Sequence, residues 1–532
     1  MINRIHLYVV VFIAAILGGC TSLPPGYGFS KDISSALAHP EETRLGRQFE
    51  QAAREHEGHS GYRIMPVGVD GFLTRMQMIN AAERTLDMQY YIFRGDETGR
   101  LLTGAVLKAA DRGVRVRVLI DDGDTMTGDD QITALAVHPL VEIRIFNPFR
   151  YRGHAQLFRT VEFMFSAGRL NYRMHNKLLV VDNAIALIGG RNIGDEYFQI
   201  DPASQVADDD VLSAGPIASQ LSATFDEYWN SGLSIPVEAL SGGKTSHDTL
   251  SEHREELKDE SQQLKADGVS YVKRLATGEP FNGIISGRLP LIWAHAQLIC
   301  DSPDKKKVEA GTKAGRLMQW RVADTTSAAQ SEFILITPYL IPGGEGMQLF
   351  KDLRQRNVRV RILTSSLESS TVLSAQSGYM HYRVPLLEQG VELYEIRSLL
   401  GNARGSGQTT AISDYGNYGL HAKLFVFDRR RLLIGSMNFD QRSMHINTEI
   451  GLIIDSPTLA QQIAARFEAM VQPANAYQLA LRPSDTVGGR QGLVWHTREN
   501  AKTVAYETEP ARSEWQRAGV NILSLLRLDT QL

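Results

Sequence analysis

The sequence predicts an α/β protein made of two similar domains, each a mixed, mostly parallel sheet covered by helices. The first observation is length, because 532 residues exceed what one ordinary hydrophobic core holds together. The second is a repeat, since RGVRVRVL at residues 112–119 returns as RNVRVRIL at residues 356–363. The third is that each copy follows a helix-like stretch and runs into an apolar strand, which is typical of βαβ units.

The elements of both halves follow in the same order. In the first half an apolar run at residues 88–93 precedes a helix-like stretch at 101–111, and a longer apolar run covers 178–188. The second half repeats this order with runs at 333–336 and 424–434 around a helix-like stretch at 346–355. We therefore expect two equivalent sheets, related by pseudo-twofold symmetry.

Composition shifts mark the boundaries of these domains. Residues 240–268 begin with Ser-Gly-Gly-Lys and continue into a charged stretch, which is typical of a connector with a solvated helix. The tail from about residue 482 ends in an apolar segment that we expect to pack against the second half. The predicted divisions are a signal peptide (1–19), an N-terminal extension (20–60), a first domain (61–235), a connector (236–315), a second domain (316–480) and a C-terminal extension (481–532).

The N-terminus carries a short apolar leader. Arg4 precedes eleven apolar residues at 7–17, which is too short for a transmembrane helix and suits the core of a signal peptide. Leu17-Gly-Gly-Cys20 then resembles the bacterial lipobox, which implies that Cys20 carries a lipid and anchors the protein to a membrane. We expect a lipid-anchored protein in the bacterial cell envelope that faces the periplasm. Thr21 after the cysteine favours the outer membrane over the inner one.

Composition also limits the function. Cys20 and Cys300 are the only cysteines, which excludes a disulfide framework and a zinc site of the CxxC type. Cys300 closes an apolar run, so we expect a buried free thiol. The formal net charge of −4 gives no support for nucleic acid as a partner.

One motif occurs once in each half. HNKLLVVD spans residues 175–182 and HAKLFVFD spans residues 421–428, and each is followed by a second apolar run that ends in Gly-x-x-Asn. Residues i and i+2 of a strand share a face, so the histidine and lysine of each copy point the same way. The residues expected to carry chemistry are His175, Lys177, Asp182 and Asn192 in the first half, and His421, Lys423, Asp428, Ser436 and Asn438 in the second.

These residue types suit phosphoryl chemistry. Lysine and asparagine can hold phosphate oxygens, whereas histidine can attack or transfer a proton. Two copies brought together at the interface of the domains place one histidine on each side of a phosphorus atom, as an in-line displacement requires. Asp182 and Asp428 follow the strands, and a role as structural ion-pair partners is the alternative to a catalytic one.

Two further carboxylates align between the halves. Residues 208–216 and 449–457 have equal lengths and both end in proline, which pairs Asp208 with Glu449. A carboxylate on one imidazole nitrogen fixes the tautomer of a histidine and supports its charged form. Asp208 is chosen over Asp209 and Asp210 on this alignment alone. The loop acids Asp121, Asp122, Asp124 and Asp130 are interpreted as solvated, because a histidine mechanism needs no metal.

The repeated pattern His-x-Lys-x4-Asp-x6-Gly-(Gly/Ser)-x-Asn resembles the signature of the phospholipase D superfamily. The resemblance runs from about residue 66 to about residue 480, and GGRNIGDEY at residues 189–197 is most similar to bacterial cardiolipin synthases of the C type. It implies two phospholipase D-like domains, no cofactor and no metal. Because the first copy usually attacks in this superfamily, His175 is the expected nucleophile and His421 the general acid. Gly190 departs from the serine that many members have.

The resemblance also implies phospholipid substrates. The leading function is a phosphatidyl transferase that forms cardiolipin from phosphatidylglycerol and a second phospholipid, with phosphatidylethanolamine as a candidate donor. A phospholipase D that releases phosphatidic acid shares the same covalent intermediate and stays open. A phosphodiesterase or nuclease is less favoured, and a binding module without catalysis is a fourth alternative. The need for an accessory protein is left open.

Overall fold

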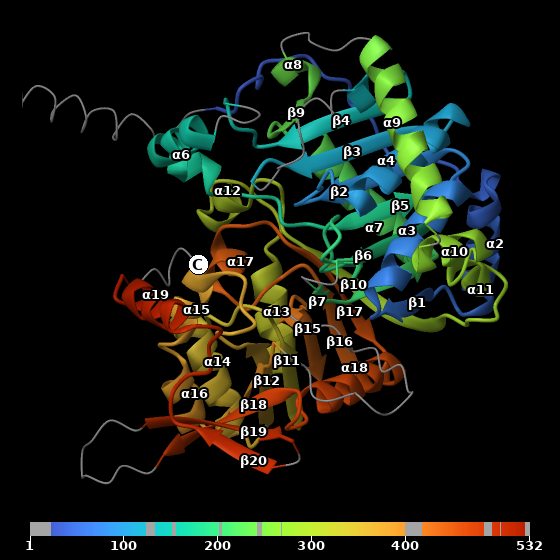
Figure 1. The fold of residues 1–532 in the computed structure, drawn as a ribbon. Coiled ribbons are helices and arrows are strands. Elements are labelled where there is room, and N and C mark those ends of the chain that lie inside the picture. Colours follow the sequence, from blue (N-terminus) through green and yellow to red (C-terminus); the bar gives the residue numbers. More distant parts are fainter. Residues whose placement is uncertain are drawn as a thin grey trace, which may run out of the picture.

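The structure is a computed structural model, and it describes residues 23–123, 134–151, 156–201, 205–241, 247–267, 269–398, 418–482, 492–500 and 502–526. Two mixed sheets lie one beside the other and carry helices on their faces (Figure 1). The two-domain α/β architecture predicted from the repeat is confirmed. Cys20 and the predicted leader lie outside the described residues.

The first sheet has three parallel strands, which lie next to its edge strand β9. Strands β2, β3 and β4 pair in parallel, and all the other pairs within this sheet are antiparallel. Antiparallel pairs therefore outnumber parallel ones, which corrects the expectation of a mostly parallel sheet. The strands are β1 (Ser60–Met65), β2 (Thr85–Tyr90), β3 (Arg115–Asp121), β4 (Val141–Phe146), β5 (Leu178–Val181), β6 (Ile185–Gly189), β8 (Asp210–Ala214) and β9 (Ser234–Pro236).

The second sheet repeats this plan. Its parallel centre is formed by β11, β12 and β13, and β15 runs antiparallel beside β11 as β5 does beside β2. The C-terminal tail adds two strands to the far edge of this sheet, which the sequence did not predict. The strands are β11 (Glu332–Ile336), β12 (Arg359–Ser365), β13 (Glu392–Ile396), β15 (Leu424–Phe427), β16 (Arg431–Gly435), β17 (Ile450–Asp455), β18 (Ala476–Arg482), β19 (Gly492–Glu499) and β20 (Lys502–Tyr506).

One strand joins the two sheets. Strand β10 (Ile292–Cys300) pairs through its first residues with β1 and through the rest with β17. The connector predicted over residues 236–315 therefore contributes a strand to both sheets and is more than a tether. Cys300, at the end of this strand, is buried and free, as expected.

The helices cover the outer faces and fill the space between the sheets. A shared core contains residues of α7, α18 and strands of both halves, so the interface of the two domains is itself a hydrophobic core. The longer helices are α2 (Arg44–Glu55), α3 (Gly68–Ala81), α4 (Glu97–Asp111), α6 (Gln156–Leu170), α7 (Pro216–Trp229), α9 (His247–Ala266), α13 (Met318–Ser327), α14 (Gly343–Gln355), α18 (Pro457–Met470) and α19 (Glu514–Ser524).

Shorter elements complete the fold. The short helices are η2 (Pro40–Glu42), α8 (Glu238–Ser241), α10 (Ser270–Thr277), α11 (Phe281–Ile285), α12 (Lys305–Glu309), α15 (Leu373–Tyr379), α16 (Arg383–Glu388) and α17 (Gln441–His445). A separate two-stranded pair is formed by β7 (Gln205–Ala207) and β14 (Tyr418–Leu420). Within the described ranges, no helix combines the length and apolar character needed to cross a bilayer.

Candidate active site

The two halves exchange backbone contacts just before each motif histidine. The His421 amide donates to the Ala207 carbonyl at 2.8 Å, and the His175 amide donates to the Thr448 carbonyl at 2.9 Å. The residue after each of these carbonyls is one of the two aligned carboxylates. Each half therefore delivers its carboxylate to the histidine of the other half.

The histidines contact these carboxylates through Nδ1. His175 Nδ1 lies 2.9 and 3.0 Å from the Glu449 oxygens, and His421 Nδ1 lies 2.5 Å from Asp208 Oδ2. Asp208, and not its neighbours Asp209 or Asp210, makes this contact. A carboxylate that accepts Nδ1–H leaves Nε2 of each imidazole free to react.

The motif lysines lie beside the histidines of their own copy, as the strand periodicity predicts. Lys177 Nζ donates to the His175 carbonyl at 2.6 Å, and Lys423 Nζ donates to the His421 carbonyl. Burial lowers the pKa of Lys177 well below its usual value and lowers the pKa of Lys423 to about 8. Two desolvated ammonium groups in one small site form a place for an anion such as a phosphodiester.

This environment keeps both imidazoles neutral in the free protein. Burial, and then the charges of Lys177 and Lys423, lower the pKa of His175 well below its usual value. Burial and Lys423 likewise lower the pKa of His421 to about 3. A neutral imidazole has a lone pair for attack, and an anionic phosphodiester bound between the lysines would raise the pKa of the histidine that must donate a proton.

The two carboxylates differ in their surroundings. Burial raises the pKa of Glu449 to about 7. Burial acts on Asp208 in the same direction, but the nearby His421 and Lys423 outweigh it, and the pKa of Asp208 lies below its usual value. Ser436 donates its hydroxyl hydrogen to Glu449 at 2.5 Å, so it supports the carboxylate on His175.

Gly190 holds the position that corresponds to Ser436. A Cβ atom at Gly190 would lie 2.2 Å from Asp208 Oδ1, so the carboxylate occupies the space that a side chain would need. A serine hydroxyl at position 190 therefore has no room beside Asp208, the shorter of the two acids. Glycine with Asp208 on one side matches serine with Glu449 on the other.

The motif aspartates do not join the site, which corrects their placement among the catalytic residues. The Asp182 carboxylate accepts the backbone amides of residues 83–85, and the Asp428 carboxylate accepts those of residues 330–332. Each lies at the end of its strand that is remote from the histidine. Both adopt positive φ in the turn that leads to the next strand, so they hold the hairpin to the neighbouring strand.

The asparagines and two tyrosines complete the surroundings of the histidines. Asn192 Oδ1 accepts the Ile92 amide at 3.2 Å, whereas the buried Asn438 Oδ1 has no hydrogen-bond partner among the described residues. The Tyr91 ring lies edge-on to His175 at 5.0 Å, and the Tyr197 ring lies edge-on to His421 at 5.2 Å. Sequence reasoning missed both rings, although Tyr91 directly follows a strand that pairs with the motif strand.

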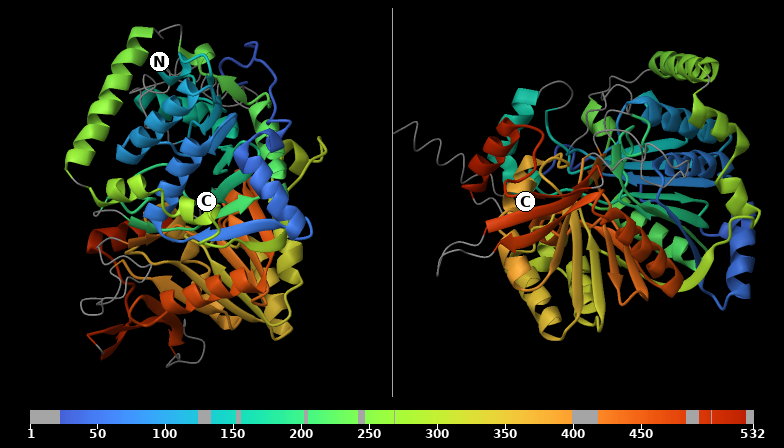
Figure 2. Two further views of the ribbon diagram at one scale, coloured as in Figure 1. Left: turned by 90° about the vertical axis from the view of Figure 1, so that its right-hand side faces the viewer. Right: turned by 60° about the horizontal axis from the view of Figure 1, so that its bottom comes forward.

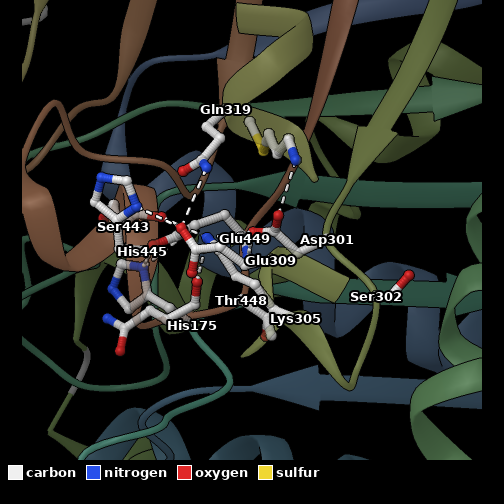
Figure 3. Close-up of polar contacts among 12 residues, drawn as sticks. His175, Asp301, Ser302, Lys305, Glu309, Gln319, Ser443, His445, Thr448 and Glu449 are labelled. Carbon is white, nitrogen blue, oxygen red and sulfur yellow. Dashed lines mark hydrogen bonds and ion pairs between the residues drawn. The ribbon is translucent and has the colours of Figure 1, made fainter. Parts of the chain in front are cut away.

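A second set of buried acids supports the first. Asp301 accepts the Glu449 amide and the Lys305 ammonium, both at 2.9 Å, and Figure 3 shows these side chains grouped next to His175. Asp121 accepts the Met174 amide at 2.8 Å and so fixes the residue before His175. The sequence interpretation of the loop acids as solvated is wrong for Asp121 and its neighbour, because both are buried.

The other two loop acids, Asp124 and Asp130, lie outside the described residues. Within the described part of the chain, no cluster of three or more histidine, cysteine or acidic side chains is arranged to hold a metal ion.

Comparison with known proteins gives these residues a family. The model of the family described as "Cardiolipin synthase, PLD-like domain" matches residues 76–229 and 322–471. Cardiolipin synthase C of Escherichia coli (strain K12) is 35% identical over 493 residues, which are 89% of this chain and 97% of that protein. An uncharacterized protein of Helicobacter pylori (strain ATCC 700392 / 26695) is 29% identical over 96% of this chain and 97% of its own length.

A solved structure agrees on the fold. The crystal structure of phosphatidylserine synthase from Haemophilus influenzae Rd KW20 superimposes with a TM-score of 0.56 at 12% identity, covering 91% of this chain and all of that one. The two matched segments of the family model each contain one motif histidine and one crossing carboxylate. The chain belongs to the cardiolipin synthase family of phospholipase D-like proteins.

Proposed function

We propose that the protein is a phosphatidyl transferase that forms cardiolipin from phosphatidylglycerol and a second phospholipid. The observation that carries the proposal is the pair of histidines, each oriented by a carboxylate of the opposite half, beside two buried lysines. The cardiolipin synthases among its relatives support the choice of phospholipids as substrates. Phosphatidylethanolamine is the proposed alternative donor.

The first step is attack on the donor. His175 Nε2 forms a bond to the phosphorus, and the bond from phosphorus to the headgroup oxygen breaks. His421 Nε2 gives its proton to that oxygen, so glycerol or ethanolamine leaves as a neutral alcohol. The contacts are close to symmetric, and the choice of His175 as nucleophile rests on the superfamily resemblance.

The second step reverses the first with a new alcohol. His421, now neutral, removes the proton from a hydroxyl of phosphatidylglycerol, and this oxygen attacks the phosphorus. The bond between phosphorus and His175 breaks, and cardiolipin is released. Asn192, Asn438 and the two lysines are proposed to hold the phosphate oxygens throughout, and Ser436 acts through Glu449.

Water competes with the lipid acceptor for the same intermediate. Transfer prevails only if the acceptor hydroxyl is held in position, which can be worth effective molarities of about 10⁵ M or more. Attack by water would give phosphatidic acid instead.

The test supplies the purified protein with vesicles that contain labelled phosphatidylglycerol, with and without phosphatidylethanolamine, and identifies the lipid products. We expect cardiolipin, formed more slowly by several orders of magnitude with His175→Ala. Release of phosphatidic acid alone at every density of phosphatidylglycerol would replace the transferase with a hydrolase.

We further propose that Cys20 carries the lipid anchor and that the protein faces the periplasm, with the outer membrane favoured. The support is the lipobox-like sequence and the threonine after the cysteine. A diacylglyceryl group supplies two acyl chains, which hold a protein at a membrane more firmly than one. Cys20→Ser should weaken retention in the membrane fraction, and a protein without labelled lipid at Cys20 after growth with labelled fatty acid would contradict the anchor.

A further inference from the structure

Helix α6 is amphipathic in the inverse sense. Its apolar side chains at i, i+4 and i+7, namely Leu157, Val161 and Met164, form a stripe that faces solvent. Leu157 is 73% exposed and Met164 is 68% exposed, and the flanking Phe158 is 56% exposed. A surface helix of a soluble protein normally turns such a stripe towards the core.

The charged residues of α6 point the other way. Arg159 donates to the Asp122 carbonyl at 2.6 Å, and Glu162 accepts the Arg150 amide at 2.9 Å. Arg169 donates to Asn147 Oδ1 at 2.8 Å. These hydrogen bonds hold the charged face of α6 against the protein, and the apolar face is turned outward.

A second exposed apolar face lies on the same side of the molecule. In helix α19, Trp515 is 87% exposed and Ile522 is 64% exposed, and Leu525 follows just beyond the end of the helix. Figures 1 and 2 show α6 and α19 on one side, towards which the parallel strands β2 and β3 also run. The motif histidine His175 follows the end of α6 by only five residues, so the chain leads directly from this helix into the site.

The start of the described chain reaches the same surface. Leu23 and Pro25 line a cavity of about 260 Å³ together with Tyr151, Val161 and Phe165. Cys20 precedes Leu23 by three residues in the sequence, so an anchor there lies within roughly 11 Å along the chain of the α6 surface. Lys306 donates to the Gly168 carbonyl of α6 and adds positive charge beside this helix.

We propose that the exposed apolar faces of α6 and α19 dock on the surface of a phospholipid bilayer and hold the active site against it. The choice of a bilayer as the occupant rests on the proposed function, since the substrates are then lipids of that bilayer. Insertion of the α6 stripe turns exposed apolar area into buried area, and the inward hydrogen bonds of Arg159, Glu162 and Arg169 stay intact. Docking adds an orientation that a lipid anchor on a chain end does not provide.

The test measures binding to vesicles without turnover, so that its failure is distinct from a failure of the proposed activity. The full chain with Cys20→Ser removes the anchor, and Leu157→Ser with Met164→Ser then removes two apolar contacts. The matched control carries Ile33→Ser and Trp320→Ser, which are exposed apolar positions elsewhere. We expect vesicles of phosphatidylglycerol and phosphatidylethanolamine to bind the parent and the control equally well. The α6 variant should bind the same vesicles at least about tenfold more weakly.

A second measurement reports where the helix goes. Cys300 is buried, so Met164→Cys in the Cys20→Ser chain creates an accessible thiol for a polarity-sensitive fluorophore. Its emission should shift to the blue with vesicles, whereas a label at Trp320→Cys should not. Equal binding by the parent and the α6 variant, or no shift at Met164→Cys, would overturn the proposal. So would a dimer in solution that the α6 variant converts to a monomer without any change in vesicle binding, since a second copy would then be the occupant.

Discussion

The contact between Glu449 and His175 allows a quantitative test of the crossed arrangement. Glu449→Gln keeps the size and shape of the side chain and removes its charge. The carboxylate is fully buried, and both oxygens lie within 3.0 Å of His175 Nδ1. Its partner becomes positively charged only when Nε2 bonds to phosphorus, so the interaction lost is one made during the reaction.

The magnitude follows from that contact. A hydrogen bond to a charged group contributes about 1.5–3 kcal/mol, which corresponds to a loss of roughly 10- to 150-fold in rate. Because the neutral imidazole of the free enzyme can still donate to the glutamine oxygen, we expect the loss in kcat with little change in KM. The assay is cardiolipin formation in vesicles at saturating phosphatidylglycerol.

A double-mutant cycle assigns the partner. In a His175→Ala background Glu449→Gln should cause no further loss, whereas Asp208→Asn should couple in this way to His421. Thermal denaturation of each variant checks that it folds. A loss below twofold for Glu449→Gln, or coupling of Glu449 to His421 in place of His175, would refute the crossed arrangement.

Three other outcomes are expected. The value of kcat/KM should fall as pH rises through about 8, because Lys423 loses its positive charge above its pKa and then binds the phosphate less strongly. A flat profile to about pH 10 contradicts this. Gly190→Ala should reduce kcat about 100-fold by displacing Asp208, and Gly104→Ala, which meets nothing within 4 Å, is the matched control that should stay active. Asp182→Asn should weaken the hydrogen bonds to three backbone amides, lower the free energy of unfolding by about 1–3 kcal/mol and so lower the melting temperature. The folded protein should retain its kcat, and a large loss of kcat would instead restore the catalytic role of Asp182.

The site was accessible from the sequence because its residues repeat. Strand periodicity placed Lys177 beside His175 and Lys423 beside His421, and the structure has both contacts. The alignment of residues 208–216 with residues 449–457 selected Asp208 among three adjacent aspartates. It did not reveal which histidine each carboxylate contacts. That depends on backbone pairing between the halves, which local patterns do not encode.

Other features depend on tertiary contacts in the same way. A strand that is buried on both faces has the same continuous apolar pattern whether its neighbours run parallel or antiparallel. The sequence therefore did not predict the excess of antiparallel pairs. Strand β10 lies within the segment predicted as a connector, yet its partners lie in both sheets. An amphipathic pattern over α6 shows that a helix has two faces, but only the structure shows which one is turned outward.

During the reaction, one histidine of a site built from both halves should carry the phosphatidyl group. The direct measurement is mass spectrometry of the protein quenched during reaction with labelled phosphatidylglycerol, with the modified residue identified by fragmentation. We predict a phosphatidyl group on His175 that accumulates in His421→Ala and is absent from His175→Ala. A group found on His421 alone would reverse the roles, and turnover without any lipid on either histidine would contradict the covalent mechanism.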